Sequence, residues 1–140
     1  MAPQSLLLVA LGGAAGTSIR QLVAQLMPVS DGGWPTATFA VNISGAFLLG
    51  VLVEALARGG PDVGWRLRAR LFAGVGFCGA LTTYSTLAVE VLLLVRGDQS
   101  ETAVAYAVAS VVAGLLAAAA GVVVASAAHR RSDSSGPSRS

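Results

Sequence analysis

The sequence has few charged residues and no lysine. Only 11% of its 140 residues are charged, compared with about 25% in typical soluble domains, whereas 54% are hydrophobic. All nine basic residues are arginine, the formal net charge is only +2, and no basic patch is interleaved with aromatic residues. This composition argues against nucleic-acid binding and is typical of an integral membrane protein with one small bundle of helices.

Cysteine and histidine are also nearly absent. Cys78 is the only cysteine, which excludes an intrachain disulfide and argues against a cysteine-based metal site. The only histidine, His129, lies in the polar C-terminal segment, so the chain has no Ser-His-Asp set. It also has no pair of carboxylates on a shared helix face and no phosphate-binding loop before a soluble helix. We therefore expect that the protein is not an enzyme.

Long apolar runs separated by short polar connections fill most of the chain. Because about 20 apolar residues cross a bilayer as a helix, residues 1–128 predict an all-α membrane domain with four spans. The first run has no basic residues before it, which predicts a span rather than a cleaved signal peptide. Residues 129–140 are polar and predict a disordered tail. The predicted spans cover about residues 4–27, 36–57, 71–95 and 102–128.

Small residues predict where helices approach one another closely. Gly12 and Gly16 form a small-xxx-small pattern in the first span, and residues 117–120 of the fourth span are all alanine. Such patterns let two helix backbones come into contact.

The third span has an unusual middle, residues 74–87. Three glycines there disfavour a helix by about 1 kcal/mol each relative to alanine. Four hydroxyl side chains follow, which compete for backbone hydrogen bonds. A break in the helix would free carbonyl oxygens that can bind a cation and N–H groups that can face an anion. We expect either an interrupted helix with an ion site or a continuous span whose glycines serve close packing.

Polar residues inside the spans are the candidates for function. Asn42 in the second span either forms a hydrogen bond between helices or presents its NH2 group to a permeating anion. Glu90 is an ionisable residue in the third span and a functional candidate, unless it lies near the membrane surface. Thr83, Thr86 and Glu90 share one helical face.

Two further polar residues have alternative interpretations. Arg20, late in the first span, either extends to the membrane interface or faces an aqueous vestibule that attracts anions. Ser110 lies one turn after Tyr106 on the same face of the fourth span. It either bonds the carbonyl four residues before it or lines a polar path.

The arginines are distributed unevenly between the two ends of the spans. Four spans place the N-terminus, the second connection and the C-terminus on one side of the membrane. Because basic residues favour the cytoplasmic side, both termini are predicted to lie in the cytoplasm. That side holds Arg58, Arg66, Arg68, Arg70, Arg130, Arg131 and Arg139.

These features leave three functional classes open. The first is an ion pathway built from Asn42, the hydroxyls of the third span, Tyr84 and Ser110. The second is a small proton-coupled transporter, which needs a titratable carboxylate deep in a span, and Glu90 is the only candidate. The third is a membrane scaffold, which would not need the Gly/Thr segment. In each case four short spans should oligomerise, most simply as a dimer.

Three motifs resemble one known family over nearly the whole chain. They are residues 12–16 with Arg20, residues 41–45 with 47–50, and residues 76–86, which read Gly-Phe-Cys-Gly-Ala-Leu-Thr-Thr-Tyr-Ser-Thr. In order and spacing they are similar to the CrcB/Fluc fluoride channels. The resemblance implies an antiparallel dimer of four-span subunits in the cell membrane. It also implies passive, fluoride-selective conduction that lowers the fluoride concentration of the cytoplasm.

The resemblance also implies site residues. A structural sodium ion would be held at the dimer centre by the backbone carbonyls of Gly79 and Thr82 from both subunits. The fluoride pathway would include Asn42, Ser85 and Ser110. The glutamate that the family has late in the third span corresponds to Glu90.

One position departs from the family pattern. The family typically has two phenylalanines in the third span, whose positive ring edges contact fluoride. This chain has Tyr84, which keeps a ring edge, and Leu87, which has none. The missing ring and the uneven arginines suggest a heterodimer with a homologous subunit of opposite orientation. In that case this chain alone would be a non-conducting half of the channel. The alternative is a homodimer in which Tyr84 suffices.

Overall fold

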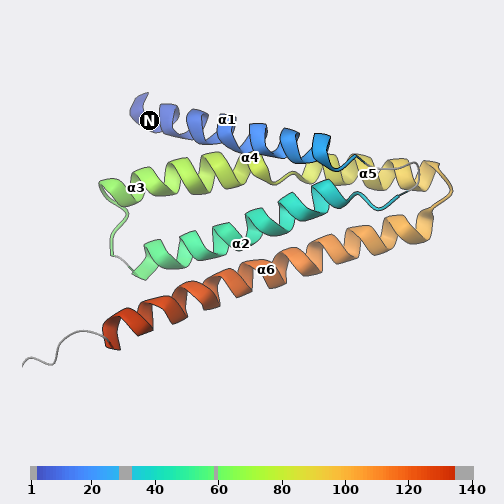
Figure 1. Cartoon of the computed structure of the whole chain (residues 1–140). Helices are drawn as coiled ribbons and strands as arrows, with labels where there is room; N and C mark the ends of the chain where they lie inside the picture. The colour runs from blue at the N-terminus through green and yellow to red at the C-terminus, as the bar shows by residue number, and fades with distance from the viewer. Residues whose placement is uncertain (1–2, 29–32, 59, 135–140) are drawn as a thin grey trace, which may run out of the picture.

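The computed structural model describes residues 3–28, 33–58 and 60–134, and its elements within these ranges are all helical (Figure 1). Four stretches there are long and apolar enough to cross a bilayer, so the protein is a multi-pass membrane protein and the predicted all-α fold is confirmed. The elements are α1 (Pro3–Leu26), α2 (Thr36–Arg58), α3 (Trp65–Ala69), the π-helix η1 (Arg70–Cys78), α4 (Gly79–Leu81), α5 (Tyr84–Arg96) and α6 (Ser100–Ser134).

The ends of the first two spans lie within a residue or so of their predicted positions, but those of the other two differ. The third span begins at Trp65, since α3 continues directly into η1 with right-handed helical backbone at Arg70. The last helix ends at Ser134, so it includes residues 129–134 of the segment that the sequence assigns to a polar tail. This segment contains no helix-breaking Gly or Pro. Residues 135–140 lie outside the described ranges.

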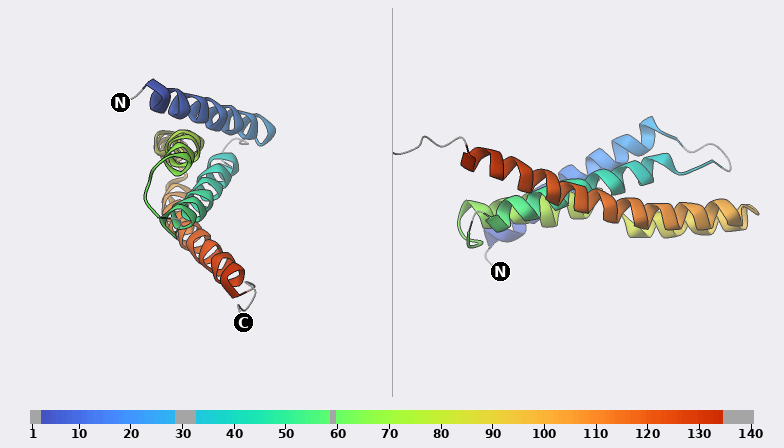
Figure 2. Two further views of the ribbon diagram at one scale, coloured as in Figure 1. Left: turned by 90° about the vertical axis from the view of Figure 1, so that its left-hand side faces the viewer. Right: turned by 90° about the horizontal axis from the view of Figure 1, so that it is seen from below.

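The helices run side by side in an open array. The N-terminus, the connection from α2 to α3 and the C-terminal end of α6 lie together at one end (Figures 1 and 2). Seen end-on in Figure 2, α1 and α6 lie on opposite sides, with α2 and the third span between them. This leaves long apolar helix faces without a neighbour from the same chain, including Leu115 and Leu116 of α6, which are 68% and 66% exposed.

Glycines allow α1 and the third span to pack backbone against backbone. A side chain at Gly12 or Gly16 would overlap the carbonyl oxygen of Phe72 or Phe77. From the other helix, a Cβ added at Gly76 would lie 2.7 Å from the carbonyl oxygen of Val9. The close contact predicted from Gly12 and Gly16 is therefore confirmed.

A second glycine contact joins α2 to α6. A side chain at Gly50 would overlap the backbone of Ala118, which confirms the close contact predicted for the alanines at 117–120. Gly121 likewise faces the backbone of Phe47. Together the two contacts fix α2 and α6 as one pair and α1 and η1 as another, and the segment between the pairs contains the candidate site.

Candidate functional site

The third span is interrupted at two threonines. Helical backbone continues through Gly79 to Leu81, and then Thr82 (φ −78°, ψ 150°) and Thr83 (φ −148°, ψ 118°) are extended before α5 begins at Tyr84. The predicted interruption is confirmed, but the glycines before it remain helical. The halves on either side contact different neighbours, since η1 and α4 pack against α1 and α5 packs against α6.

Asn42 of α2 binds the extended backbone from the side. Its Oδ1 accepts from the N–H of Thr83 at 2.7 Å, and its Nδ2 donates to the carbonyl of the same residue at 3.2 Å. The amide thus pairs with Thr83 as a neighbouring β-strand would. This is the interhelical hydrogen bond considered for Asn42 from the sequence. An NH2 group carries two hydrogens, so one remains for a further acceptor.

Hydroxyl groups gather on the α5 side of the break. Thr83 is the N-cap of α5, and its Oγ1 accepts from the N–H of Thr86 at 3.1 Å. The same oxygen donates to Oγ1 of Thr86 at 2.9 Å and lies 3.2 Å from Oγ of Ser85. Tyr84, Ser85 and Thr86 are exposed on this single chain, Tyr84 to 82%. These side chains are therefore available to a molecule or subunit outside the chain.

The α4 side of the break presents backbone carbonyls. Both the N–H and the hydroxyl of Thr82 donate to the carbonyl of Cys78, at 3.1 and 2.9 Å. The N–H of Thr83, which a continuous helix would direct to the carbonyl of Gly79, is bonded to Asn42 instead. The break therefore diverts the usual partner of the Gly79 carbonyl.

Oxygen donors of this kind fit a hard cation such as sodium. The described residues contain no group of three or more His, Cys, Asp or Glu side chains that could hold a metal. A cation here would thus depend on the carbonyls of Gly79 and Thr82. A single break offers few such oxygens.

Glu90 is held between two other helices, α2 and α6. The hydroxyl of Thr38 on α2 donates to its Oε1 at 2.7 Å, and the phenol of Tyr106 on α6 donates to its Oε2 at 2.7 Å. Thr38 is 7% exposed and Tyr106 is fully buried. Both carboxylate oxygens therefore have donors from the protein.

Ser110 lies one turn beyond Tyr106, with its hydroxyl buried and no hydrogen-bond partner among the described residues. One of the two sequence interpretations expected this hydroxyl to bond the carbonyl four residues before it, and that bond is not present. Ser110 is one of the residues that line a groove of about 590 Å³ between α2 and α6. The other lining residues are mainly small or apolar: Ala46, Leu49, Gly50, Val53, Val111, Gly114, Leu115, Ala118, Ala119 and Val122.

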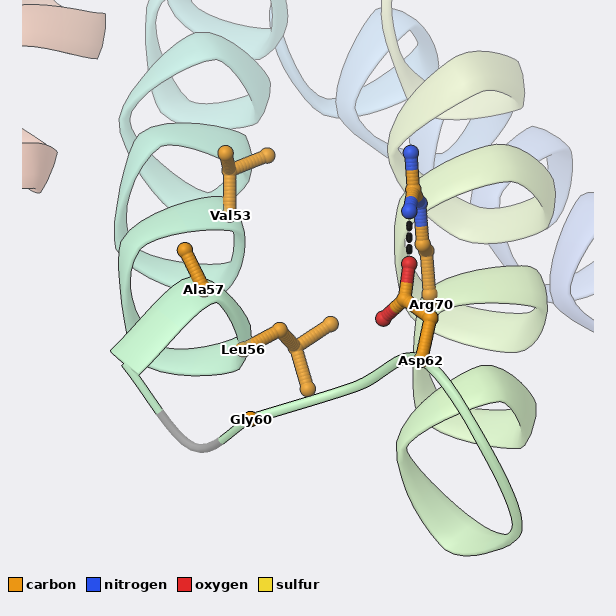
Figure 3. A pocket seen from close by; sticks show the side chains of 6 residues that line it. All are labelled: Val53, Leu56, Ala57, Gly60, Asp62 and Arg70. Carbon is orange, nitrogen blue, oxygen red and sulfur yellow. Dashed lines mark hydrogen bonds and ion pairs between the residues drawn. The ribbon is translucent and has the colours of Figure 1, made fainter.

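Two other features lie away from the break. Arg20 is half-buried on α1, and neither of the ion pairs between described residues includes it. A pocket of about 290 Å³ lies where α2 meets the following loop, and Figure 3 shows Arg70 donating to Asp62 on the side of the pocket opposite α2. The charges of this pair offset each other, so the pocket is not in itself an anion site.

Comparison with known sequences places this arrangement in a family. A family model described as "CrcB-like protein, Camphor Resistance (CrcB)" matches residues 7–122. The chain belongs to the CrcB family.

Relatives of this CrcB-family chain cover most of its length. It is 45% identical over 111 residues to "Fluoride-specific ion channel FluC 1" of Cutibacterium acnes, covering 79% of this chain and 78% of that one. It is 45% identical over 121 residues to "Fluoride-specific ion channel FluC" of Sphingopyxis alaskensis, covering 86% and 94%. "Fluoride-specific ion channel FluC 2" of Rhodococcus jostii is 46% identical over 116 residues, covering 81% and 92%.

Sequence reasoning missed Thr38 and the hydrogen bond from Tyr106 to Glu90. A signal for Thr38 was present, because it lies four residues before Asn42 and so shares its helix face. The sequence places Tyr106 only one turn before Ser110 on the fourth span. Its contact with Glu90 depends on how α5 and α6 are rotated, which the sequence pattern does not specify.

Proposed function

We propose that this protein is a subunit of a fluoride-selective passive ion channel in the cell membrane. Its family and the names of its relatives support a channel for fluoride rather than an enzyme. The observation that carries the proposal is the broken third span, held open by Asn42 inside an otherwise apolar bundle. Irregular backbone at membrane depth is tolerated where it lines a cavity or is buried in protein.

Such a channel would protect a cell in acidic surroundings. Fluoride enters as neutral HF, which crosses the bilayer and ionises in the less acidic cytoplasm. The anion is then trapped, and a passive channel lets it leave down its gradient. No energy source or covalent chemistry is required.

The pathway that we propose uses hydrogen-bond donors from three helices. Fluoride is small and strongly hydrated, so a pore must replace its water with donors. The remaining hydrogen of the Asn42 amide, the exposed hydroxyl of Ser85 and the unpartnered hydroxyl of Ser110 can supply them. Tyr84 adds a positive ring edge and a phenol.

We also propose a structural sodium ion at the break, held by the carbonyls of Gly79 and Thr82 from two subunits. The diversion of the Thr83 N–H to Asn42 supports this position. Bound there, the ion would supply a fixed positive charge that favours anions nearby.

The partner that we propose is a second, antiparallel subunit. In a single chain Tyr84 is 82% exposed, and the groove beside Ser110 is open on one side. A single chain therefore does not enclose the proposed pathway at either place. Leu87 packs against the cluster of Leu94, Ala103 and Tyr106 within its own chain and offers no ring. A homologous subunit with both aromatic residues would supply the missing one.

The uneven arginines favour a heterodimer over a homodimer. A subunit that forms an antiparallel homodimer must insert in both orientations, which a strong charge bias opposes. The C-terminal ends of α2 and α6, and α3 with the start of η1, lie towards the end of the bundle that holds the start of α1 (Figure 1). These segments contain six arginines: Arg58, Arg66, Arg68, Arg70, Arg130 and Arg131. We therefore propose that this chain inserts with both termini in the cytoplasm and pairs with a subunit of opposite orientation.

A growth assay tests the proposed function in cells. Bacteria that lack their own fluoride exporter would express this chain, alone or with a homologous subunit, in mildly acidic medium containing fluoride. We expect growth to be restored by one of the two arrangements and lost with Asn42→Asp. If neither the chain alone nor the pair of subunits restored growth at normal membrane expression, the proposal would be contradicted. If the restored growth were lost when the proton gradient is dissipated, a proton-coupled transporter that uses Glu90 would be favoured.

A further inference from the structure

Trp34 packs against Tyr106, the largest fully buried side chain among the described residues. Its ring meets the Tyr106 ring edge-to-face, with centroids 5.3 Å apart and planes at 83°. Trp34 is itself contacted edge-to-face by Phe39 of α2, at 5.6 Å and 78°. The segment before α2 is thereby joined to the start of α6.

Tyr106 has a second contact at the other end of its ring, the hydrogen bond from its phenol to Glu90. A phenol can keep that bond only while its ring stays at a fixed angle. Backbone packing alone does not fix this angle, since a tyrosine can adopt several rotamers. Trp34, half-buried at the edge of the cluster, limits where the ring can move.

Glu90 lies close to the pathway proposed above. One of its donors, Thr38, is one helical turn before Asn42, and the other, Tyr106, is one turn before Ser110. A carboxylate with a free oxygen at this depth would be costly and would repel an anion on the path. The two hydrogen bonds offset part of this cost.

We propose that Trp34 is a positioning residue for conduction: it holds the Tyr106 phenol on Glu90, so that both carboxylate oxygens stay engaged and fluoride can pass. The role rests on the proposed fluoride channel. It concerns a residue outside the motifs in the spans, on the segment that leads into α2.

Fluoride efflux from liposomes tests the role in the full chain, reconstituted with a homologous subunit if efflux requires one. Trp34→Ala should lower efflux about tenfold or more, as expected when a hydrogen bond to a charged group is lost. Trp34→Phe keeps a ring and should stay within about twofold of the wild type. Trp65→Ala is the matched control, because Trp65 is 67% exposed on α3 and should leave efflux unchanged.

Double variants separate positioning from general structural damage. If Trp34 acts through the phenol and Glu90, Trp34→Ala should cause little further loss in a Tyr106→Phe or a Glu90→Gln background. Losses that multiply in these backgrounds would overturn the proposal. So would Trp34→Phe failing as badly as Trp34→Ala while the protein remains folded.

A fluorescence measurement keeps the two proposals distinguishable. In a Trp65→Phe background Trp34 is the only tryptophan, and quenching by acrylamide reports its access to solvent. Tyr106→Phe removes the hydrogen bond between residues 106 and 90, and Glu90→Gln removes its charge; both should increase this quenching, whether or not the protein conducts fluoride. Unchanged quenching in both variants would overturn the positioning role, whereas absent efflux with increased quenching would contradict only the channel.

Discussion

Residue 42 illustrates why a particular side chain is needed at the break. An amide can both donate to and accept from one backbone residue, and Asn42 does so with Thr83. A carboxylate lacks the donor, and a hydroxyl is too short to reach both groups with the same geometry. The same amide retains one hydrogen that can face an anion, so structure and conduction depend on a single group.

Replacing Asn42 with Asp should therefore suppress conduction. Asn42→Asp keeps the acceptor for the Thr83 N–H, loses the donor and places a negative charge beside the path. We expect fluoride efflux to fall about tenfold or more. Asn42→Ala removes the pairing without adding charge and serves as the comparison. Unchanged efflux in Asn42→Asp would exclude a role for this residue in the pathway.

Two buried serines on α6 form a matched pair for a second prediction. Ser110 has an unpartnered hydroxyl, whereas Ser126 donates to Glu54 at 2.6 Å and accepts from Arg58 at 3.2 Å. Ser110→Ala should lower efflux several-fold without lowering thermal stability, since no hydrogen bond is lost. Ser126→Ala should cost about 1 kcal/mol in stability and leave efflux unchanged. The opposite pattern would place the pathway elsewhere.

For single residues, the sequence indicates which polar side chains in the spans matter better than it indicates their hydrogen-bond partners. Asn42, Glu90 and Ser110 stand out because polar side chains in apolar spans need a partner or a function. Thr38 is 52 residues from Glu90 in sequence, and nothing local indicates that the two meet. Such contacts follow from the rotation of one helix against another, which is set by packing over the whole bundle.

Among the elements, the third span combines two effects that the sequence pattern does not separate. Its glycines were expected to weaken the helix, but Gly76 is buried against α1 and Gly79 keeps helical backbone. The break falls at Thr82 and Thr83, where Asn42 offers the backbone an alternative partner. The predicted interruption and the close packing of a glycine therefore occur together, in different parts of the span, whereas the ion site stays a prediction. The exact position depends on a contact from another helix, which local propensity cannot supply.

Two glycines of this span should respond differently to alanine. A Cβ at Gly76 would lie 2.7 Å from the Val9 carbonyl and 3.0 Å from Gly12, so Gly76→Ala should separate the helices and destabilise the fold by about 1–3 kcal/mol or more. A Cβ at Gly79 meets only the Gly74 carbonyl, at 3.9 Å, so Gly79→Ala should fold normally.

The informative result is conduction by the folded Gly79 variants. If the carbonyls at the break hold sodium between subunits, added bulk should lower efflux, and Gly79→Val should lower it further. Dimer formation, measured by size exclusion in detergent, would show whether assembly is also affected. Normal folding, dimerisation and efflux in both Gly79 variants would refute the proposed sodium site.

The whole molecule is an open array that a second subunit can complete. Its outer faces are apolar, as expected in lipid or at a subunit contact, and Tyr84 projects from the chain near the break. Sequence patterns predicted the number of spans and their approximate bounds because apolar runs of sufficient length have few alternatives. They did not predict which helices would pair, since small residues occur in every span.

Orientation in the membrane tests the heterodimer directly. In a Cys78→Ser background, Val63→Cys and Ser100→Cys place a thiol at exposed positions towards opposite ends of the bundle. If the arginines fix one orientation, an impermeant thiol reagent added outside intact cells should label Ser100→Cys and leave Val63→Cys unlabelled. Labelling of both when the chain is expressed alone would count strongly against a heterodimer.

The most direct test of the channel is fluoride efflux from liposomes, followed with a fluoride electrode and compared with chloride efflux. The chain would be reconstituted alone and with a homologous subunit. We predict fast, passive efflux that is selective for fluoride in at least one of these preparations. Efflux from the chain alone would establish a homodimer that tolerates Leu87. Efflux only with the partner would establish the heterodimer. No fluoride efflux from folded protein in either preparation, or equal efflux of chloride, would contradict a fluoride-selective channel.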